Sequence, residues 1–460
     1  MFLYDLENTF RDKKVLIMGL GLHGGGAGAA SFFAKLGARV LVTDLKTRRE
    51  LARSFTSLKR FKNISYVLGG HRKDDIIGAD IIIKNPGVPD DSSWMRLAKV
   101  HGVPISSDIE FFFKLCPAKI IGITGTKGKS TTAQLLFNIL RSSARRRVWL
   151  AGNIRKSVLK ILPKIRKNHL VVLELSSFQL DSLANSRLSP QVAVVTNIFP
   201  DHLNRYKDFR NYAASKAGIF RYQKSHDYLF VPSGGGSLRN LTRRVKPRKI
   251  FVDFEKTLKP YSAIVEKRFF RHQLSSVALA VSVGRHLGVS AKDVHRTIEN
   301  FHQLPGRLEK VRVFGGVTFV NDTTATNPSS ATAALKAVSQ KSYEVQPRKI
   351  SNVVLIAGGS DKKLPVNDFA RAICEFAKVV VFLPGEATGR MKSKIKNQKS
   401  KIIMCEARTM EEAVIKAYGL AERGDTVLLS PGAASFGLFQ NEFDRGGQFV
   451  KAVMKLKPKR

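Results

Sequence analysis

The chain of 460 residues is poor in cysteine and in acidic side chains, and it has no long hydrophobic run. Its three cysteines, Cys116, Cys374 and Cys405, are odd in number and far apart, without a CxxC pair, so we expect reduced thiols in a cytoplasmic protein. No uninterrupted apolar stretch approaches the roughly 18 residues that cross a bilayer, so membrane insertion is not expected. The first residues, MFLYDLENTFRDKK, carry acids where a signal peptide is basic, which argues against export.

The shortage of acids leaves a strongly basic protein: 36 aspartates and glutamates stand against 78 lysines and arginines, a net charge of +42. Basic residues cluster at 141–147, 239–249 and 391–401 and in the C-terminal tail KLKPKR. Such a surface attracts phosphate-rich ligands and binds polyanions through counterion release. No basic run is interleaved with aromatic residues, and no nucleic-acid-binding motif is present. The charge therefore favours a generally basic surface with weak, nonspecific polyanion binding over a specific polyanion partner.

Apolar runs typical of strands alternate with helix-like stretches along the whole chain, which indicates α/β domains with parallel sheets. A chain of this length is too long for a single core. We predict a Rossmann-like domain at 1–116, a central mononucleotide-binding α/β domain with a P-loop at 117–310, and a second Rossmann-like domain at 311–460. The expected strands are KVLIMG, ARVLVTD, ISYVLG, ADIIIKNPG, KIIGITG, HLVVLELS, VAVVTNIF, VTFVND, NVVLIAGG, VVVFLPG and DTVLLSPG, with a helical region at 271–301 and a loop at 232–237.

A first glycine-rich turn lies in VLIMGLGLHGGG, residues 15–26. Gly19, Gly21 and Gly24 have the G-x-G-x-x-G spacing that follows a strand in dinucleotide-binding domains. Asp44 lies 20 positions after the last of these glycines, where it can hold a ribose hydroxyl. Taken alone, the pattern favours a nicotinamide- or flavin-dependent oxidoreductase, but a single match of this kind is a weak signal.

A second glycine-rich turn, GITGTKGKS at 122–130, lies between an apolar run and a helix-like stretch. Such a loop turns backbone N–H groups toward phosphate oxygens, Lys129 can reach the terminal phosphates, and the Ser130 hydroxyl can ligate Mg²⁺. The spacing departs from the usual motif, because five residues rather than four separate Gly122 from Gly128. The turn predicts binding of a nucleoside triphosphate, for which an oxidoreductase has no use.

Polar residues that suit a Mg²⁺-nucleotide site follow two later strands. Glu174 lies at the end of the run HLVVLELS, where a lone carboxylate is unfavourable unless it pairs or binds a metal. Asp201 and His202 follow the run VAVVTNIF, in a loop of the kind that builds active sites in open α/β sheets. A single histidine is more often structural, but two such strand ends after a phosphate loop favour a functional role for His202.

The motifs GITGTKGKS, ELSSFQL, TNIFPDHLNRY, LPGR and NDTTATNP, in this order, resemble those of the Mur ligases of peptidoglycan synthesis, and the resemblance covers nearly the whole chain. The late motifs NDTTATN and LLSPGAASFGLFQNEFDRG are similar to those of the members that add D-glutamate. The resemblance implies ATP-dependent ligation of D-glutamate to UDP-N-acetylmuramoyl-L-alanine through an acyl phosphate, giving ADP and phosphate, with ATP and a pair of Mg²⁺ ions as cofactors. It also implies a cytoplasmic monomer whose first glycine-rich turn holds UDP and neither NAD nor a flavin.

The resemblance also implies roles for single residues. It assigns catalysis to Lys129, Glu174, His202 and Lys216, and metal binding to Ser130, Glu174, His202 and Lys216 as a carbamate. It assigns ATP binding to Gly125, Thr126, Lys127, Gly128, Lys129, Ser130, Thr131, Gln273, Arg307 and Asp322. It assigns the UDP substrate to Leu22, His23, Asp44, Lys46, Asn85, Gly87, Asn153, Ser176 and His202. It assigns D-glutamate to Thr326, Lys362, Ser435 and Phe443, with Lys363 as an alternative to Lys362.

The chain departs from the family pattern where adenine would be bound. His272-Gln273-Leu274-Ser275-Ser276 stands where His-Asn-x-x-Asn is expected; Gln273 offers the same amide groups, whereas Ser276 does not. A sibling Mur ligase or a folylpolyglutamate synthetase-like ligase, with another amino acid, therefore stays open, although the latter is expected to begin near its ATP loop. A catalytically decayed nucleotide- or polyanion-binding protein also stays open, although Lys129, Glu174 and His202 are intact.

Overall fold

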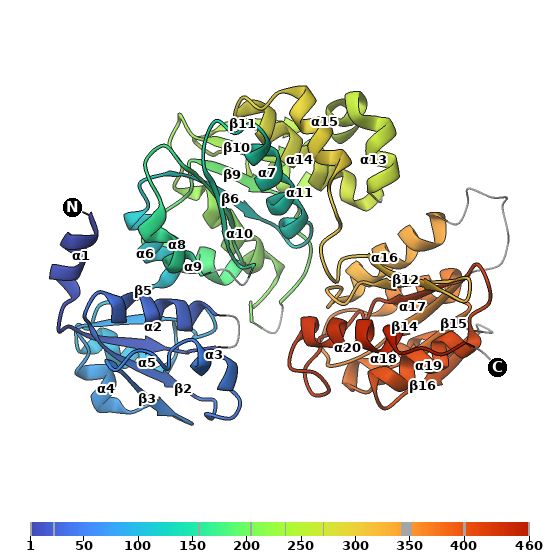
Figure 1. Ribbon diagram of the computed structural model, residues 1–460, viewed down its shortest axis with the longest axis horizontal. Helices are drawn as coiled ribbons and strands as arrows, with labels where there is room; N and C mark the ends of the chain where they lie inside the picture. Colours follow the sequence, from blue (N-terminus) through green and yellow to red (C-terminus); the bar gives the residue numbers. More distant parts are fainter. Residues whose placement is uncertain are drawn as a thin grey trace. The chain divides into compact units, whose positions relative to one another are not determined.

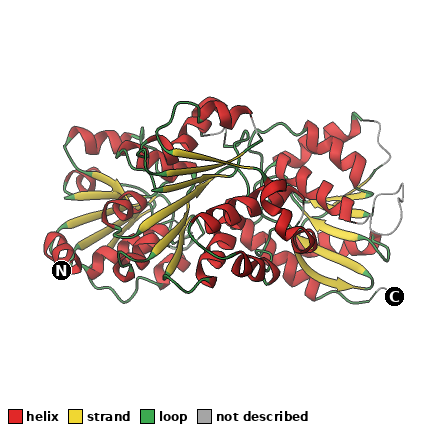
Figure 2. Ribbon diagram, turned by 90° about the horizontal axis from the view of Figure 1, so that it is seen from above, coloured by secondary structure: helices red, strands yellow, loops and turns green. Residues whose placement is uncertain are grey.

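The computed structural model describes residues 2–21, 24–154, 157–202, 205–234, 236–269, 271–341, 352–398 and 402–458. The chain divides into two compact units. The first comprises Met1–Ile198, Ala213–Ile264 and Ser275–Glu299, and the second comprises Phe199–Tyr212, Val265–Leu274 and Asn300–Arg460. Two sheets belong to the first unit and one to the second (Figure 1), and Figure 2 shows helices along the strands of each sheet. The predicted α/β class with parallel sheets is confirmed.

The first sheet has the strand order β3-β2-β1-β4-β5 and is parallel throughout. Its strands are β1 (Lys14–Met18), β2 (Arg39–Asp44), β3 (Ile64–Leu68), β4 (Ile81–Lys84) and β5 (Ile105–Ser107). The helices of this region are α1 (Phe2–Phe10), α2 (Gly25–Lys35), α3 (Ala52–Thr56), α4 (Lys73–Ile77), α5 (Ser93–Val100) and α6 (Asp108–Leu115). The strand order reverses between β1 and β4, and open α/β sheets bind ligands at the carboxyl ends of such strands.

The second sheet has the order β11-β10-β9-β6-β8-β7 and is also parallel. Its strands are β6 (Lys119–Thr124), β7 (Val148–Gly152), β8 (Leu170–Glu174), β9 (Val192–Val195), β10 (Tyr228–Pro232) and β11 (Arg248–Val252). Its helices are α7 (Lys129–Ser142), α8 (Val158–Ile161), η1 (Leu162–Lys164), α9 (Ser177–Asn185), α10 (Phe209–Arg221), α11 (Gly236–Leu241), α12 (Phe254–Leu258), η2 (Lys259–Tyr261), α13 (Ser262–Arg268), α14 (Leu274–His286) and α15 (Ala291–Glu299). The central strands are buried on both faces, so they form continuous hydrophobic runs in the sequence.

The third sheet, in the second unit, has the order β12-β13-β17-β14-β15-β16, and only the pair β12–β13 is antiparallel. Its strands are β12 (Glu309–Phe314), β13 (Val317–Asn321), β14 (Val353–Ala357), β15 (Val379–Phe382), β16 (Ile403–Glu406) and β17 (Thr426–Leu429). The helices of this unit are η3 (Arg271–Gln273), α16 (Pro328–Lys341), α17 (Asn367–Phe376), α18 (Glu386–Lys396), α19 (Met410–Leu420) and α20 (Glu442–Met454).

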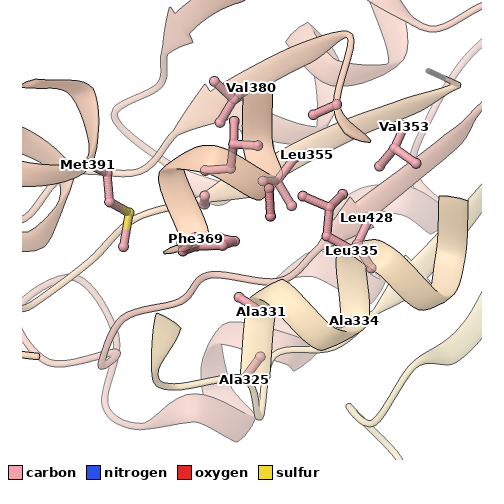
Figure 3. Close-up of a cluster of buried hydrophobic side chains, with 14 of the residues drawn as sticks. Ala325, Ala331, Ala334, Leu335, Val353, Leu355, Phe369, Val380, Met391 and Leu428 are labelled. Carbon is pink, nitrogen blue, oxygen red and sulfur yellow. The ribbon is translucent and has the colours of Figure 1, made fainter. Parts of the chain in front are cut away.

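The core of the third sheet has two layers, one on each face. Val353 and Leu355 of β14 point to the layer that α16, α17 and α18 cover, where they meet Leu335 and Phe369 (Figure 3). The alternate residues of the same strand, including Ile356, point to the layer under α19 and α20. This period of two places a buried apolar face on each side of every central strand.

Each of the eleven predicted apolar runs contains a strand, and the helical region at 271–301 is formed by η3, α14 and α15. Strands β5, β7, β10, β11, β12 and β16 were not among those predicted. The predicted loop at 232–237 is shorter than expected, because Pro232 ends β10 and α11 begins at Gly236; Gly235 lies outside the described residues. Over the described part of the chain, no helix combines the length and apolarity that a membrane span needs.

Candidate functional site

The loop between β6 and α7 has a backbone that only glycine can follow at two positions. Gly125 and Gly128 have φ values of 147° and 81°. A Cβ atom at Gly125 would lie 2.0 Å from Thr196 Oγ1, and one at Gly128 would lie 2.2 Å from Ser276 Oγ. These glycines therefore let the loop turn tightly against its neighbours, with the amino end of α7 directed at the loop, an arrangement that suits a phosphate group.

The same loop is held by residues that follow β9. The backbone N–H of Thr126 donates to Asn197 O at 3.0 Å, and that of Lys127 donates to Asn197 Oδ1 at 2.9 Å. Asn197 Nδ2 returns a bond to Lys127 O at 3.1 Å, and Thr196 Oγ1 donates to the same carbonyl at 2.5 Å. The loop is thus braced by uncharged groups before any ligand arrives.

Lys129 folds back over the loop that precedes it. Its Nζ donates to Gly125 O at 2.8 Å and to Thr126 O at 3.0 Å. The ammonium group is therefore held over the turn at which a phosphate chain would lie. The predicted ATP residues Gly125 to Thr131 are all contiguous in this loop and the first turn of α7.

Next to the loop, a hydroxyl and a carboxylate meet. Ser130 Oγ donates to Glu174 Oε2 at 2.5 Å, and Asn153 Nδ2 donates to Glu174 Oε1 at 3.2 Å. Glu174 is only 2% exposed and ends β8. A buried carboxylate with neutral hydrogen-bond donors favours a cation, and hydroxyl and carboxylate oxygens are ligands that Mg²⁺ prefers. The donor set therefore fits Mg²⁺.

Three or more His, Cys, Asp or Glu side chains suited to a metal do not come together anywhere in the described ranges. The predicted ligand His202 belongs to the second unit, so its place beside Ser130 and Glu174 stays a prediction. Lys216 is in the first unit, 2% exposed, and its Nζ donates to Thr124 Oγ1 at 3.2 Å. Lys216 belongs to α10, and its Nζ thus reaches the end of β6; its carbamylation stays a prediction.

In the first sheet, the glycine-rich turn after β1 is braced by a carboxylate. Asp44 is buried at the end of β2; its Oδ2 accepts from Gly21 N at 3.1 Å and its Oδ1 accepts from Lys46 N at 2.9 Å. In the loop after β4, Asn85 Oδ1 accepts from Gly87 N at 3.0 Å. Asp44, Lys46, Asn85 and Gly87 thus lie at the carboxyl ends of β2 and β4, whereas the predicted Leu22 and His23 are outside the described residues.

Two further residues predicted for the UDP substrate lie near Glu174. The Asn153 backbone N–H donates to Glu174 O at 2.8 Å, in addition to its side-chain bond. Ser176 caps α9: its Oγ accepts from Gln179 N at 3.3 Å and donates to Gln179 Oε1 at 3.2 Å. Ser176 therefore has a structural role as a helix cap, whatever it contributes to a ligand.

In the second unit, residues from three segments converge on a buried carboxylate, Asp201. Its Oδ2 accepts from Asn327 Nδ2 at 3.0 Å, and Lys362 Nζ lies 4.0 Å from its Oδ1. Lys362 Nζ also donates to Thr326 Oγ1 at 3.2 Å. His202 follows in a left-handed conformation with φ 54° and donates its backbone N–H to Asp201 Oδ1 at 2.9 Å. Two residues predicted for D-glutamate, Thr326 and Lys362, thus meet beside the predicted metal loop; Asp201 and Asn327 complete the cluster.

The other predicted residues of the second unit are dispersed. Asp322 is buried and accepts from Leu308 N at 3.2 Å and from Ser430 Oγ at 2.9 Å. Gln273 is buried and donates to Gln303 Oε1 at 3.1 Å. The remaining three are the half-buried Arg307, the buried Ser435 and the 38% exposed Phe443 at the start of α20. Gln273 and the phosphate loop lie in different units, so an adenine contact stays a prediction.

Sequence reasoning missed Arg445, which is completely buried in α20. Its guanidinium donates to Thr323 Oγ1 at 3.2 Å, Thr323 O at 2.8 Å and Ala433 O at 3.1 Å. Burial lowers the pKa of Arg445 to about 10, which leaves it charged at neutral pH. It joins the NDTTATN and SPGAAS loops. The only signal in the sequence is the arginine of FDRG in the last motif.

Comparison with known proteins follows the three-sheet division. Residues 13–107 match the model described as Mur ligase MurD-like, N-terminal domain. Residues 123–302 match the Mur ligase middle domain, and residues 306–432 match the Mur ligase, glutamate ligase domain.

Full-length relatives agree with these matches. The UDP-N-acetylmuramoylalanine–D-glutamate ligase of Roseiflexus sp. (strain RS-1) is 38% identical over 470 residues, covering 96% of this chain and 98% of the relative. The ligase of the same name from Borreliella afzelii (strain PKo) is 34% identical, covering 97% and 98%.

Among solved structures, UDP-N-acetylmuramate-alanine ligase MurC from Thermotoga maritima aligns with a TM-score of 0.62 at 18% identity, covering 96% of this chain and 100% of that chain. MurF ligase from Thermotoga maritima in complex with ADP aligns with a TM-score of 0.58 at 17% identity, covering 98% and 97%. At these identities the likeness supports the fold alone.

Proposed function

The chain belongs to the Mur ligase family, and we propose that it joins D-glutamate to UDP-N-acetylmuramoyl-L-alanine in peptidoglycan precursor synthesis, converting ATP to ADP and phosphate. The two full-length relatives, both D-glutamate ligases by name, support this acceptor over that of a sibling ligase. The observation that carries the proposal is the phosphate loop with the Ser130–Glu174 pair beside it, because a ligase that activates a carboxylate needs a nucleotide site with a metal-binding edge.

The reaction proceeds in two steps. A carboxylate oxygen of the alanyl group attacks the γ-phosphorus of ATP, and ADP leaves, which gives an acyl phosphate. The D-glutamate amine then attacks the acyl carbon, loses a proton, and the tetrahedral intermediate expels phosphate. Two anions must approach each other in the first step, so positive charge between them lowers the barrier. Lys129, held over the loop, supplies part of that charge.

Ser130 and Glu174 would hold Mg²⁺, which would neutralise the charge that develops on the transferred phosphoryl group. Proposed further ligands are His202 and Lys216 as its carbamate, and a pair of ions is part of the proposal. Further proposed contacts to ATP are Gln273, Arg307 and Asp322. The UDP substrate is proposed to bind at the first glycine-rich turn, with contacts from Asp44, Lys46, Asn85, Gly87, Asn153 and Ser176.

The cluster around Asp201 supports a D-glutamate site. Lys362 provides a cation and Thr326 a hydroxyl, which together suit one carboxylate of a dicarboxylic amino acid through charge-assisted hydrogen bonds. Asp201, at 4.0 Å from Lys362 Nζ, fixes the direction of that ammonium group. Ser435 and Phe443 are proposed to complete the site.

We also propose that the protein acts as a monomer in the cytoplasm. The three cysteines form no disulfide, which supports a reducing compartment. We propose domain bounds of 1–116, 117–310 and 311–460. The first region would bind the UDP substrate and the second ATP, while the third would bind D-glutamate and complete the ATP site.

The test is phosphate release from ATP by the purified protein with Mg²⁺ and UDP-N-acetylmuramoyl-L-alanine. D-glutamate, L-glutamate, lysine, diaminopimelate and no amino acid are compared, and each product is identified by mass. Release that requires both the uridine substrate and D-glutamate supports the proposal. Phosphate release with another amino acid would mean that this amino acid, and not D-glutamate, is the substrate. ATP binding without phosphate release would contradict ligase activity.

A further inference from the structure

A cavity of about 430 Å³ lies in the first unit, at the amino end of the second sheet. Arg187 precedes β9, Arg221 and Lys224 precede β10, and Lys246 precedes β11; all four line the cavity, and the three strands lie side by side (Figure 1). The phosphate loop follows β6, and Glu174 is the last residue of β8, so both lie at the carboxyl ends of strands. Because all strands of this sheet are parallel, the cavity is at the opposite end from the nucleotide loop.

The lining of the cavity is cationic. The four basic side chains are exposed, and none of the described residues that line the cavity is acidic. The surrounding stretch 205–249 has 12 lysines and arginines against two aspartates. Of these, Asp227 is directed to the Lys224 backbone N–H, with which its Oδ2 forms a 2.7 Å hydrogen bond, and to His226. Four like charges around one hollow repel each other, and an anion would relieve this repulsion.

A buried glutamine supports the wall of the cavity. Gln223 lines the cavity and is 2% exposed. Its Nε2 donates to Pro190 O at 2.9 Å and to Tyr228 O at 3.0 Å, which fixes the amide group. Its Oε1 has no hydrogen-bond partner among the described residues. Gln223 thus joins the segment before β9 to the start of β10, and so holds two strands that border the cavity.

Arg187 occupies a position at which glycine is usual. It follows α9 with φ 54°, its N–H donates to Ala184 O at 3.1 Å, and Leu188 N donates to Leu183 O at 2.9 Å. This pair of bonds is the helix-ending motif whose left-handed residue is commonly glycine, because a side chain is strained there. The chain nevertheless carries an arginine, whose side chain lines the cavity.

We propose that this cavity binds a phosphate group carried by a ligand, at a site separate from the ATP loop. Guanidinium and ammonium groups bind phosphate through charge-assisted hydrogen bonds, and four of them line this cavity. The concave shape and the volume suit a small phosphorylated molecule or a lipid head group. The proposal does not depend on the identity of the ligase acceptor.

Calorimetric titration with inorganic pyrophosphate tests the phosphate site. The full chain carries Lys129→Ala in every sample, so that the nucleotide loop competes less. We expect saturable binding of one equivalent. Adding Lys224→Gln and Lys246→Gln should weaken binding about tenfold, because two charge-assisted contacts are lost. The matched pair Lys164→Gln and Lys167→Gln removes the same charge from exposed lysines outside the cavity and should change the affinity less than about twofold.

Equal weakening by both lysine pairs, or no saturable binding, would overturn the proposal, because diffuse surface charge would then explain the attraction. Two arms identify the source of the phosphate. Sedimentation with phosphatidylglycerol-containing vesicles that is lost on Lys224→Gln and Lys246→Gln supports a lipid head group. Binding of glycerol 3-phosphate that depends on the same lysines, without sedimentation, supports a free metabolite. Dependence on these lysines in neither arm overturns the proposal.

Discussion

The first unit has two glycine-rich turns, one after β1 in the first sheet and one after β6 in the second. Different chemical groups hold the two turns in place. The turn after β1 is braced by a carboxylate: Asp44, which also accepts from Lys46 N, accepts the backbone N–H of Gly21. The turn after β6 is braced by the uncharged Asn197 and by its own Lys129, whose ammonium group is held over it. Within the described residues, Lys129 thus places positive charge directly over the second turn.

The difference shows why a glycine pattern identifies a turn and not its ligand. Both sequences permit a close approach of backbone to a phosphate group. The ends of neighbouring strands then distinguish the two turns. Each has a buried carboxylate beside it, but Asp44 accepts from backbone N–H groups, whereas Glu174 accepts from a serine hydroxyl and an asparagine amide, a set of side chains suited to a metal. The oxidoreductase interpretation of the first turn is accordingly replaced by the ligase family to which the chain belongs.

The largest expected effect is a loss of ATP turnover at the second turn that leaves substrate binding at the first turn unchanged. Lys129→Ala should lower ATP turnover by about a thousandfold or more, because it removes the charge held over the phosphate loop. The dissociation constant for UDP-N-acetylmuramoyl-L-alanine should stay within about twofold, since the first turn is built without this lysine. Phosphate release and calorimetric titration measure the two quantities. Lys119→Ala, at the start of β6, is the control, and loss of both functions in Lys129→Ala would contradict the division of roles.

A second prediction extends the comparison to the turn after β14, which carries two adjacent lysines. Lys362 is half-buried against Thr326, whereas Lys363 is exposed. Lys362→Met should lower kcat/KM for D-glutamate by about a hundredfold through loss of a charge-assisted contact, with little change in the KM for ATP. Lys363→Met should leave both within about twofold. Initial rates at varied D-glutamate check this, and a larger effect at Lys363 would transfer the role to that residue.

Ten of the eleven strands that could be predicted from the sequence have two neighbours in their sheet, and β3 is the one edge strand among them. β1, β6, β8 and β14 are buried on both faces and form unbroken apolar runs. Five of the six edge strands were missed. Charged residues interrupt β11, RKIFV, and β12, EKVRVF, because one side of an edge strand is exposed, whereas β5 has only three residues. Strand β10 is the exception, a buried run that precedes the glycine cluster and was overlooked.

The site shows the same limit at the level of side chains. The contact between Ser130 and Glu174 could be expected, because both residues follow adjacent parallel strands, whose carboxyl ends share one edge. Arg445 could not, because its partner Thr323 is 122 positions away and no local pattern indicates that an arginine is buried. Long-range polar contacts of this kind follow from the packing of α20, which a single sequence does not reveal.

A third prediction uses the acid that packs against the first turn. Asp108 is buried, its Oδ1 has no hydrogen-bond partner among the described residues, and burial raises its pKa to about 6. The ordinary pKa is near 4, so the folded state opposes ionisation: the penalty is absent below that value, grows as the pH rises to 6, and is constant above it. Asp108→Asn should therefore raise the free energy of unfolding at pH 8 by up to about 3 kcal/mol.

The measurement is thermal unfolding of both proteins between pH 4.5 and 8. The variant should melt higher at pH 8, and the difference should shrink toward pH 4.5, where the wild-type carboxyl is protonated in the folded state. Asp91→Asn, at an exposed position, should show no such pH dependence. A constant difference at all pH values would mean that the asparagine changes packing and not charge.

The smallest expected effect concerns the brace itself. Asp44→Ala leaves the backbone N–H groups of Gly21 and Lys46 without their acceptor, so the first turn should lose its fixed geometry. The dissociation constant for UDP should rise about tenfold in Asp44→Ala. Asp44→Asn keeps one carbonyl oxygen, so its dissociation constant should lie between those of Asp44→Ala and the wild type. Calorimetric titration with UDP and with ATP provides both readings. Because the second turn is braced by Asn197 and Lys129, ATP affinity should not change. If Asp44→Ala weakened ATP and UDP binding equally, the two turns would be coupled, and their bracing could not be treated as independent.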